Sequence, residues 1–69
     1  MQKKRNNFRI GERVEVVLPE GADPIPSGTW TVVYRGSIME DNSKRLYRLR
    51  NEGNDQELTF WAMHIHPVN

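Results

Sequence analysis

Apolar side chains occupy every second position in several short stretches of this chain. In the first, residues 13–18, Val14, Val16 and Leu18 lie on one side of an extended backbone. A period of two with β-branched residues is typical of a half-buried β-strand. The same alternation recurs in three further stretches, at residues 29–37, 45–50 and 57–61.

Turn-forming residues separate these stretches. Residues 19–28 hold three prolines and two glycines, which predicts a long ordered loop because these residues favour turns. Residues 39–44 are mainly polar and lack glycine, which predicts a hairpin loop of more than two residues between antiparallel strands. A second turn is expected at residues 51–55, with Gly53 or Asn54 suited to a positive φ.

The tail of the chain fits two patterns. Leu58, Trp61, Ala62 and Ile65 fall at helical spacing, which indicates a short amphipathic helix. The aromatic and β-branched residues before Ala62 favour a strand instead, and Pro67 limits any helix to about two turns. We therefore expect a strand at residues 57–61, a single 3₁₀ turn at 62–64 and a short closing strand at 65–68.

Length and composition limit the architecture. The chain has 69 residues, no cysteine and a formal net charge of +1. This predicts one small domain at residues 8–69, preceded by a flexible basic arm at residues 1–7 that contains Lys3, Lys4 and Arg5. The lack of cysteine and of any long apolar run predicts a cytoplasmic protein without a membrane partner. For the oligomeric state, we expect a monomer.

Four short motifs combine turn residues with core positions of the predicted strands. They are Gly11-Glu12-Arg13-Val14, Gly28-x-Trp30-x-Val32, Tyr47-x-Leu49-x-Asn51 and Phe60-Trp61-Ala62-x-x-Ile65-x-Pro67-Val68. Over residues 8–68 this pattern resembles Tudor- and KOW-type barrels and the barrel-forming accessory protein of photosystem I. The resemblance implies an all-β fold, a single five-stranded SH3-like barrel with one 3₁₀ turn before the last strand. It implies no particular function, since the motifs encode turns and core positions.

Strand alternation also predicts which side chains form the core and which aromatic side chains remain outside it. Trp61 and Phe8 remain outside, too few aromatic groups for a complete methyl-cation cage. The long loop offers Glu20 and Asp23 without an aromatic residue, which disfavours a groove for proline-rich peptides. The predicted core consists of Val14, Val16, Leu18, Trp30, Val32, Tyr34, Tyr47, Leu49, Leu58, Phe60, Ile65 and Val68.

The sequence contains no recognisable catalytic motif, and we expect neither enzyme activity nor a cofactor. His64 and His66, two residues apart, would share one face of a strand and could offer two nitrogens to a metal. A stable site needs three or four ligands, and neither Asp55 nor Glu57 has a spacing that compels convergence. We therefore predict no metal site. A remote alternative is an oligomeric enzyme with its site on a symmetry axis, as in one plasmid-borne reductase family that uses such barrels.

Basic residues concentrate on the second and third predicted strands. If these strands pair through the hairpin, Arg35 and Arg48 should lie close together on the outer face, with Arg50 in line. Adjacent like charges suggest an anion-binding face. The alternative is that Glu15 and Glu57 neutralise the arginines and leave a solvated surface.

Apolar residues also fall on the outer faces of the strands. Val17, Val33, Leu46 and Trp61 together suggest an exposed apolar patch, which commonly marks a protein interface. The alternative is a β-bulge, because a slip of one residue reverses the faces of a strand and moves such residues into the core.

These features predict a small non-catalytic module that binds a protein partner through the outer face of strands two to four. The alternative is a nucleic-acid-binding protein, in which Arg35, Arg48, Arg50 and the basic arm follow phosphates while Trp61 stacks on a base. Acidic residues spread along the chain favour the protein partner. The predicted binding residues are Val33, Arg35, Leu46, Arg48, Arg50 and Trp61.

Overall fold

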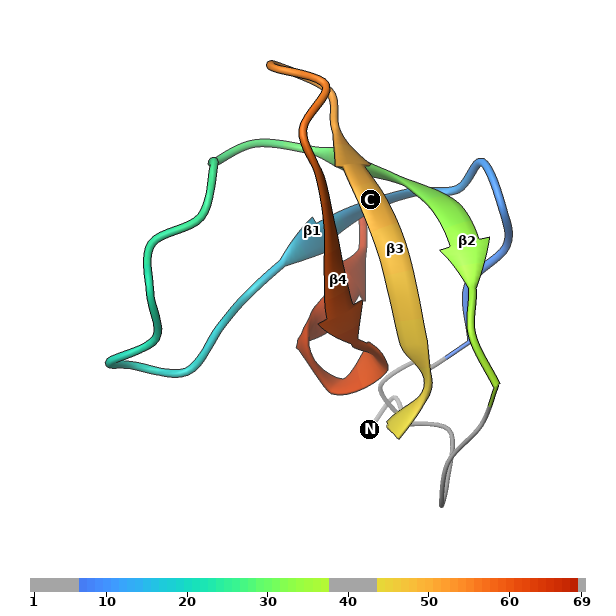
Figure 1. The fold of residues 1–69 in the computed structure, drawn as a ribbon, viewed down its shortest axis with the longest axis horizontal. Helices are drawn as coiled ribbons and strands as arrows, with labels where there is room; N and C mark the ends of the chain where they lie inside the picture. The colour runs from blue at the N-terminus through green and yellow to red at the C-terminus, as the bar shows by residue number, and fades with distance from the viewer. Residues whose placement is uncertain (1–6, 38–43, 69) are drawn as a thin grey trace.

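The chain folds into one curled antiparallel sheet of five strands. The computed structural model describes residues 7–37 and 44–68. The elements are β1 (Arg13–Val16), β2 (Trp30–Arg35), β3 (Leu46–Asn51), β4 (Glu57–Trp61), the 3₁₀ turn η2 (Ala62–His64) and β5 (Ile65–Pro67). Their order in the sheet is β4-β3-β2-β1-β5. Figure 1 shows β3 between β4 and β2.

This arrangement confirms the predicted all-β class, the number of strands and the 3₁₀ turn before the last strand. β1 and β2 are shorter than predicted, whereas β4 and η2 have the expected bounds. The helical interpretation of the tail is wrong, because residues 57–61 pair with β3 along their whole length. The sheet is not closed, so β4 and β5 lie at its two edges.

The core fills the concave side of the sheet. Trp30 and Phe60 meet edge to face with ring centroids 5.3 Å apart, a favoured aromatic geometry. Val16, Leu18, Leu58 and Ile25, the last from the long loop, pack against the core while partly buried. The buried apolar residues are Phe8, Val14, Trp30, Val32, Tyr47, Leu49, Phe60, Ala62 and Ile65.

Several core assignments from the sequence are wrong. Val68 was expected in the core and is half-buried outside it, whereas Ala62, which was not assigned to the core, is buried. Tyr34 was expected inside and is 61% exposed, because the β2–β3 register shifts between Val32 and Tyr34. The extra residue, Val33, forms a β-bulge that reverses the faces of the strand beyond it. Phe8 was expected outside and is 1% exposed. Its backbone N–H donates to the Tyr47 hydroxyl at 3.1 Å and its ring packs edge to face on that of Tyr47.

Gly36 allows a close approach between the chain after β2 and the start of β3. Its N–H donates to the Leu46 carbonyl oxygen at 2.7 Å, and a Cβ on Gly36 would lie 2.9 Å from that same oxygen. A side chain therefore does not fit here without a backbone shift. The predicted hairpin loop that follows lies outside the described residues except for Lys44.

Asn51 joins the β3–β4 turn to the long loop. It is 2% exposed, its Nδ2 donates to the Ser27 carbonyl oxygen, and its Oδ1 accepts from the N–H groups of Gly53 and Asn54. The positive φ of this turn lies at Asp55, at 62°, and not at Gly53 or Asn54 as the sequence suggested. The turn is thus fixed by the buried side chain of the last residue of β3, which the sequence prediction had assigned to the turn.

Candidate binding surface on the outer face of β2, β3 and β4

The strand register places two different groups of side chains on the convex face of the sheet. Arg13 lies opposite Thr31, Thr31 opposite Arg50, and Arg50 opposite Glu57. We call these four residues, together with Glu52, the charged row. The neighbouring pairs are Tyr34 with Arg48, Arg48 with Thr59, and Leu46 with Trp61. We call these five residues the aromatic patch.

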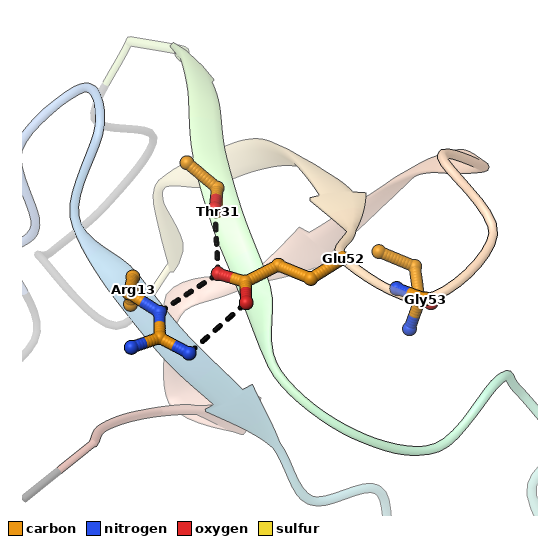
Figure 2. Close-up of polar contacts among 5 residues, drawn as sticks. Arg13, Thr31, Glu52 and Gly53 are labelled. Atoms are coloured by element: carbon orange, nitrogen blue, oxygen red, sulfur yellow. Dashed lines mark hydrogen bonds and ion pairs between the residues drawn. The ribbon is translucent and has the colours of Figure 1, made fainter.

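The Arg13 end of the charged row is held by Glu52 (Figure 2). Nε and Nη2 of Arg13 donate to the two carboxylate oxygens of Glu52 at 2.8 and 3.0 Å, and the Thr31 hydroxyl adds a bond at 3.1 Å. The hydrogen bond from Arg13 holds the pKa of Glu52 below its usual value, and the bond from Thr31 acts in the same direction. The same carboxylate raises the pKa of Arg13. The guanidinium of Arg13 and the carboxylate of Glu52 thus compensate each other's charge.

The other end of the row is paired as well. Nε and Nη2 of Arg50 donate to Oε2 of Glu57 at 3.1 and 2.8 Å. This hydrogen bond is the main cause that raises the pKa of Arg50. Arg50 therefore has its charge compensated within the protein, as one of the two sequence interpretations proposed. Glu15, the other acid named in that interpretation, lies opposite His66 on β5 instead.

The aromatic patch has a different character. Tyr34, Gly36, Leu46, Arg48 and Thr59 line a shallow hollow of about 230 Å³. Tyr34 is 61% exposed and Trp61 is 36% exposed, so both rings are accessible from solvent. Within residues 7–37 and 44–68, no hydrogen bond or ion pair engages the guanidinium group of Arg48. The patch thus combines exposed aromatic surface with an uncompensated positive charge.

The structure brings only some of the predicted binding residues together. Leu46, Arg48 and Trp61 belong to the aromatic patch, and Arg50 lies beside it in the charged row. Val33 is half-buried at the bulge. The expected contact between Arg35 and Arg48 is wrong, because Arg35 lies opposite the buried Tyr47 and so faces away from Arg48.

Two patch residues, Tyr34 and Thr59, were not among the predicted binding residues. The alternation of Tyr34 with Trp30 and Val32 predicted a core position, and the bulge at Val33 moved it to the outer face. Gly36 hinted at an irregularity near the end of this strand, but it does not identify the position of the extra residue. Because of the bulge, Tyr34 and not Arg35 lies beside Arg48.

The two histidines do not share a strand. His64 belongs to η2 and His66 to β5. In the part of the chain that the structure describes, no group of three or more His, Cys, Asp and Glu side chains is arranged to hold a metal ion. The same residues include no helix that is both long and apolar enough to traverse a bilayer.

Comparisons with protein-family models, with curated proteins and with solved structures find no match to this chain. The argument for function therefore depends on the chemistry of the surface.

Proposed function

We propose that this protein is a small non-catalytic binding module that docks a protein partner through the aromatic patch. The observation that supports this most is the guanidinium of Arg48, which has no partner among the described residues and lies beside the exposed ring of Tyr34 and a shallow hollow. Interface centres are enriched in aromatic residues and arginine, because these give large contact area and directional hydrogen bonds. Leu46 and Trp61 extend the apolar part of the surface.

A protein partner suits this face better than a nucleic acid. A strand of phosphates needs a series of uncompensated cations, and on this face Arg13 and Arg50 are already paired with Glu52 and Glu57. Arg35, the third arginine of the nucleic-acid interpretation, lies on the other face. An arginine without a partner in the described part of the chain, set among aromatic and aliphatic groups, is instead suited to an acidic side chain next to an apolar one.

The test is capture of a partner by the tagged full chain with matched variants. Tyr34→Ala and Arg48→Ala should each reduce capture of the same partner by about tenfold, which corresponds to the loss of one interface anchor. Val17→Ala is the control, because Val17 is 60% exposed and lies outside the patch. Capture that survives both patch variants, or that falls equally with Val17→Ala, would contradict the proposed surface.

We further propose that the curled sheet is an SH3-like barrel, as the motif pattern implies, and that the protein is a monomer in the cytoplasm. The order of the strands, with β1 between β2 and β5, supports the barrel assignment. Sedimentation at several concentrations tests whether the protein is a monomer. Because an enzyme site on a symmetry axis needs an oligomer, the same measurement tests the prediction that there is none. A stable oligomer with a small molecule bound on purification would refute both.

A further inference from the structure

The two edges of the sheet differ in the backbone groups that they expose. The edges are β4 and β5, because the strand order ends with them. In an antiparallel sheet, every second residue of an edge strand bonds the neighbouring strand, and the residues between direct their N–H and C=O groups outward. Such outward groups can pair with another extended chain.

The β5 edge is closed to a further strand. Val17 N–H donates to the His64 carbonyl oxygen at 2.9 Å, and by alternation the backbone groups of Ile65 and Pro67 face outward. The Ile65 N–H already donates to the Ala62 carbonyl oxygen in η2. Proline has no N–H to donate. Residues 65–67 therefore offer no outward donor to a partner.

Two hydrogen bonds at the ends of β4 fix the alternation along this strand. Asn51 N–H donates to the Gln56 carbonyl oxygen at 2.8 Å, and Ala62 N–H donates to the Arg45 carbonyl oxygen at 2.9 Å. Between these bonds, the register of β3 and β4 is regular. The even-numbered residues of β4 therefore bond β3, and the odd-numbered residues direct their backbone groups outward.

The outward residues of β4 are Glu57, Thr59 and Trp61, and all three are exposed. In the part of the chain that the structure describes, none of their N–H groups has an acceptor. β4 has neither a proline nor a bulge, two features that commonly protect an edge. Its one charged side chain, Glu57, is bound by Arg50 of β3. β4 thus presents three donors at the spacing of an extended chain.

We propose that the partner docks by β-strand addition, with an extended segment of its chain paired to the free edge of β4. The segment carries an acidic side chain opposite Thr59 and an apolar side chain opposite Trp61. This inference rests on the proposed function, because both residues belong to the aromatic patch, and it names the form of the partner. Main-chain hydrogen bonds supply affinity in this mode, and alternate side chains supply specificity.

The neighbouring side chains determine the chemistry of the segment. Arg48 lies opposite Thr59, whose side chain is short, and its guanidinium has no partner among the described residues. The added backbone would lie about 10 Å from β3, two strand spacings, which an arginine and a glutamate side chain span together. Trp61 is 36% exposed on the same face and offers its ring two residues further along. Acidic and apolar residues two positions apart match this surface.

A second copy of the chain fits the edge less well. If two β4 strands paired edge to edge, the strands nearest to Arg48 would be β4 and β3 of the other copy. These strands contain one acidic residue, Glu57, and its carboxylate already binds Arg50. The charge of Arg48 would then lack a strand residue to compensate it. A segment with its own acidic residue supplies that charge.

The first test is selection of peptides from a random linear library on the full chain. Selected peptides should contain Asp or Glu with an apolar residue two positions away. The tightest peptide is then N-methylated at one amide at a time. Binding should fall by about tenfold at every second position and stay unchanged at the positions between, because only alternate amides donate to β4. Failure to select any peptide, or losses without this period of two, would overturn the proposal.

The second test changes the edge itself. Thr59→Pro removes the central outward donor and no bond to β3, so it should weaken peptide binding by about tenfold. Thr59→Val keeps the N–H and should weaken binding less. Circular dichroism shows whether each variant folds. Amide hydrogen exchange of the unaltered protein gives an independent readout, because the peptide should protect the amides of Glu57, Thr59 and Trp61 and leave those of β5 unchanged.

The outcomes separate this inference from the proposed function. Peptide binding that falls with Tyr34→Ala, survives Thr59→Pro and leaves the edge amides unprotected would overturn strand addition while the patch stands. Binding that falls with Thr59→Pro and not with Tyr34→Ala would support strand addition and contradict the patch. Protection of the edge amides without peptide, together with a concentration-dependent dimer in sedimentation, would identify a second copy as the occupant and overturn the inference.

Discussion

The charged row and the aromatic patch are neighbours on the same sheet face and differ in what their arginines contact. In the charged row, Arg13 and Arg50 each donate two hydrogen bonds to a glutamate. In the aromatic patch, Arg48 lies on the same strand as Arg50 but opposite Tyr34 and Thr59, neither of which carries a negative charge. The difference separates arginines whose charge is compensated within the fold from one that can bind an outside group.

The largest expected change in stability comes from Trp30, because this core residue supports the sheet beneath both the charged row and the aromatic patch. Trp30 is 1% exposed, and its neighbours in the sheet, Val14 and Asn51, are also buried. Trp30→Ala should lower the free energy of unfolding by about 3–5 kcal/mol, because it creates a cavity that this small core cannot refill. That loss is comparable to the stability of the whole domain. Chemical denaturation measures it, and a loss below about 1 kcal/mol would contradict the core assignment.

A smaller loss of stability is expected from the turn that carries Glu52, which supports the charged row and not the aromatic patch. Asn51 precedes Glu52 and satisfies Ser27, Gly53 and Asn54 through its buried amide. Asn51→Ala should cost about 2 kcal/mol, because it leaves these backbone groups without their partner. Denaturation measures the loss, with Asn54→Ala as control since, among the described residues, the Asn54 side chain bonds only the nearby Gln56 N–H. Equal costs for both changes would show that the buried amide does not hold the turn.

Sequence alternation was sufficient for most of the fold, because a half-buried strand must place apolar residues at every second position. It located β4 and η2 at their observed bounds. It failed at Tyr34, since an inserted residue reverses the two faces of a strand and alternation does not reveal where the insertion lies. The prediction also missed the burial of Asn51 because it ended the strand at residue 50, whereas Asn51 is the last residue of β3 and shares its buried face with Tyr47 and Leu49.

For the candidate site too, the prediction succeeded where strands pair regularly and failed where a bulge interrupts them. Leu46, Arg48 and Trp61 were identified because β3 and β4 pair without irregularity. Arg35 was assigned to the wrong face because the prediction assumed a regular β2. The pairing of Arg13 with Glu52 joins residues 39 positions apart, which no local pattern indicates.

The patch should respond to mutation in binding and not in stability, which is the direct test of the comparison. Arg48→Ala removes a guanidinium that has no partner in the described residues, so it should change the free energy of unfolding by less than about 0.5 kcal/mol. The same variant should reduce partner capture by about tenfold. Denaturation and capture of the same preparations measure both. A clear loss of stability would mean that Arg48 has a structural role like that of Arg13.

The smallest expected effect is the pH dependence of the charged row. The bonds from Arg13 and Thr31 lower the folded-state pKa of Glu52, so the folded protein holds a proton there less readily than the unfolded chain does. The stabilisation is therefore complete above the unfolded pKa of glutamate and is lost as the pH falls through the lower, folded value. Both side chains are exposed, and water screens the pair, so the effect is modest.

Thermal melting of Glu52→Gln and of the unaltered protein across the acid range measures this effect. The variant should melt at a lower temperature at neutral pH, and the two curves should converge as the carboxylate becomes protonated. Glu20→Gln makes the same change of charge in the long loop, where the structure gives the side chain no partner among the described residues, and should melt like the unaltered protein. If the difference for Glu52→Gln persisted unchanged to the most acid pH at which the protein stays folded, the ionised carboxylate would not be what holds Arg13, and the contrast with Arg48 would have to rest on packing instead of charge.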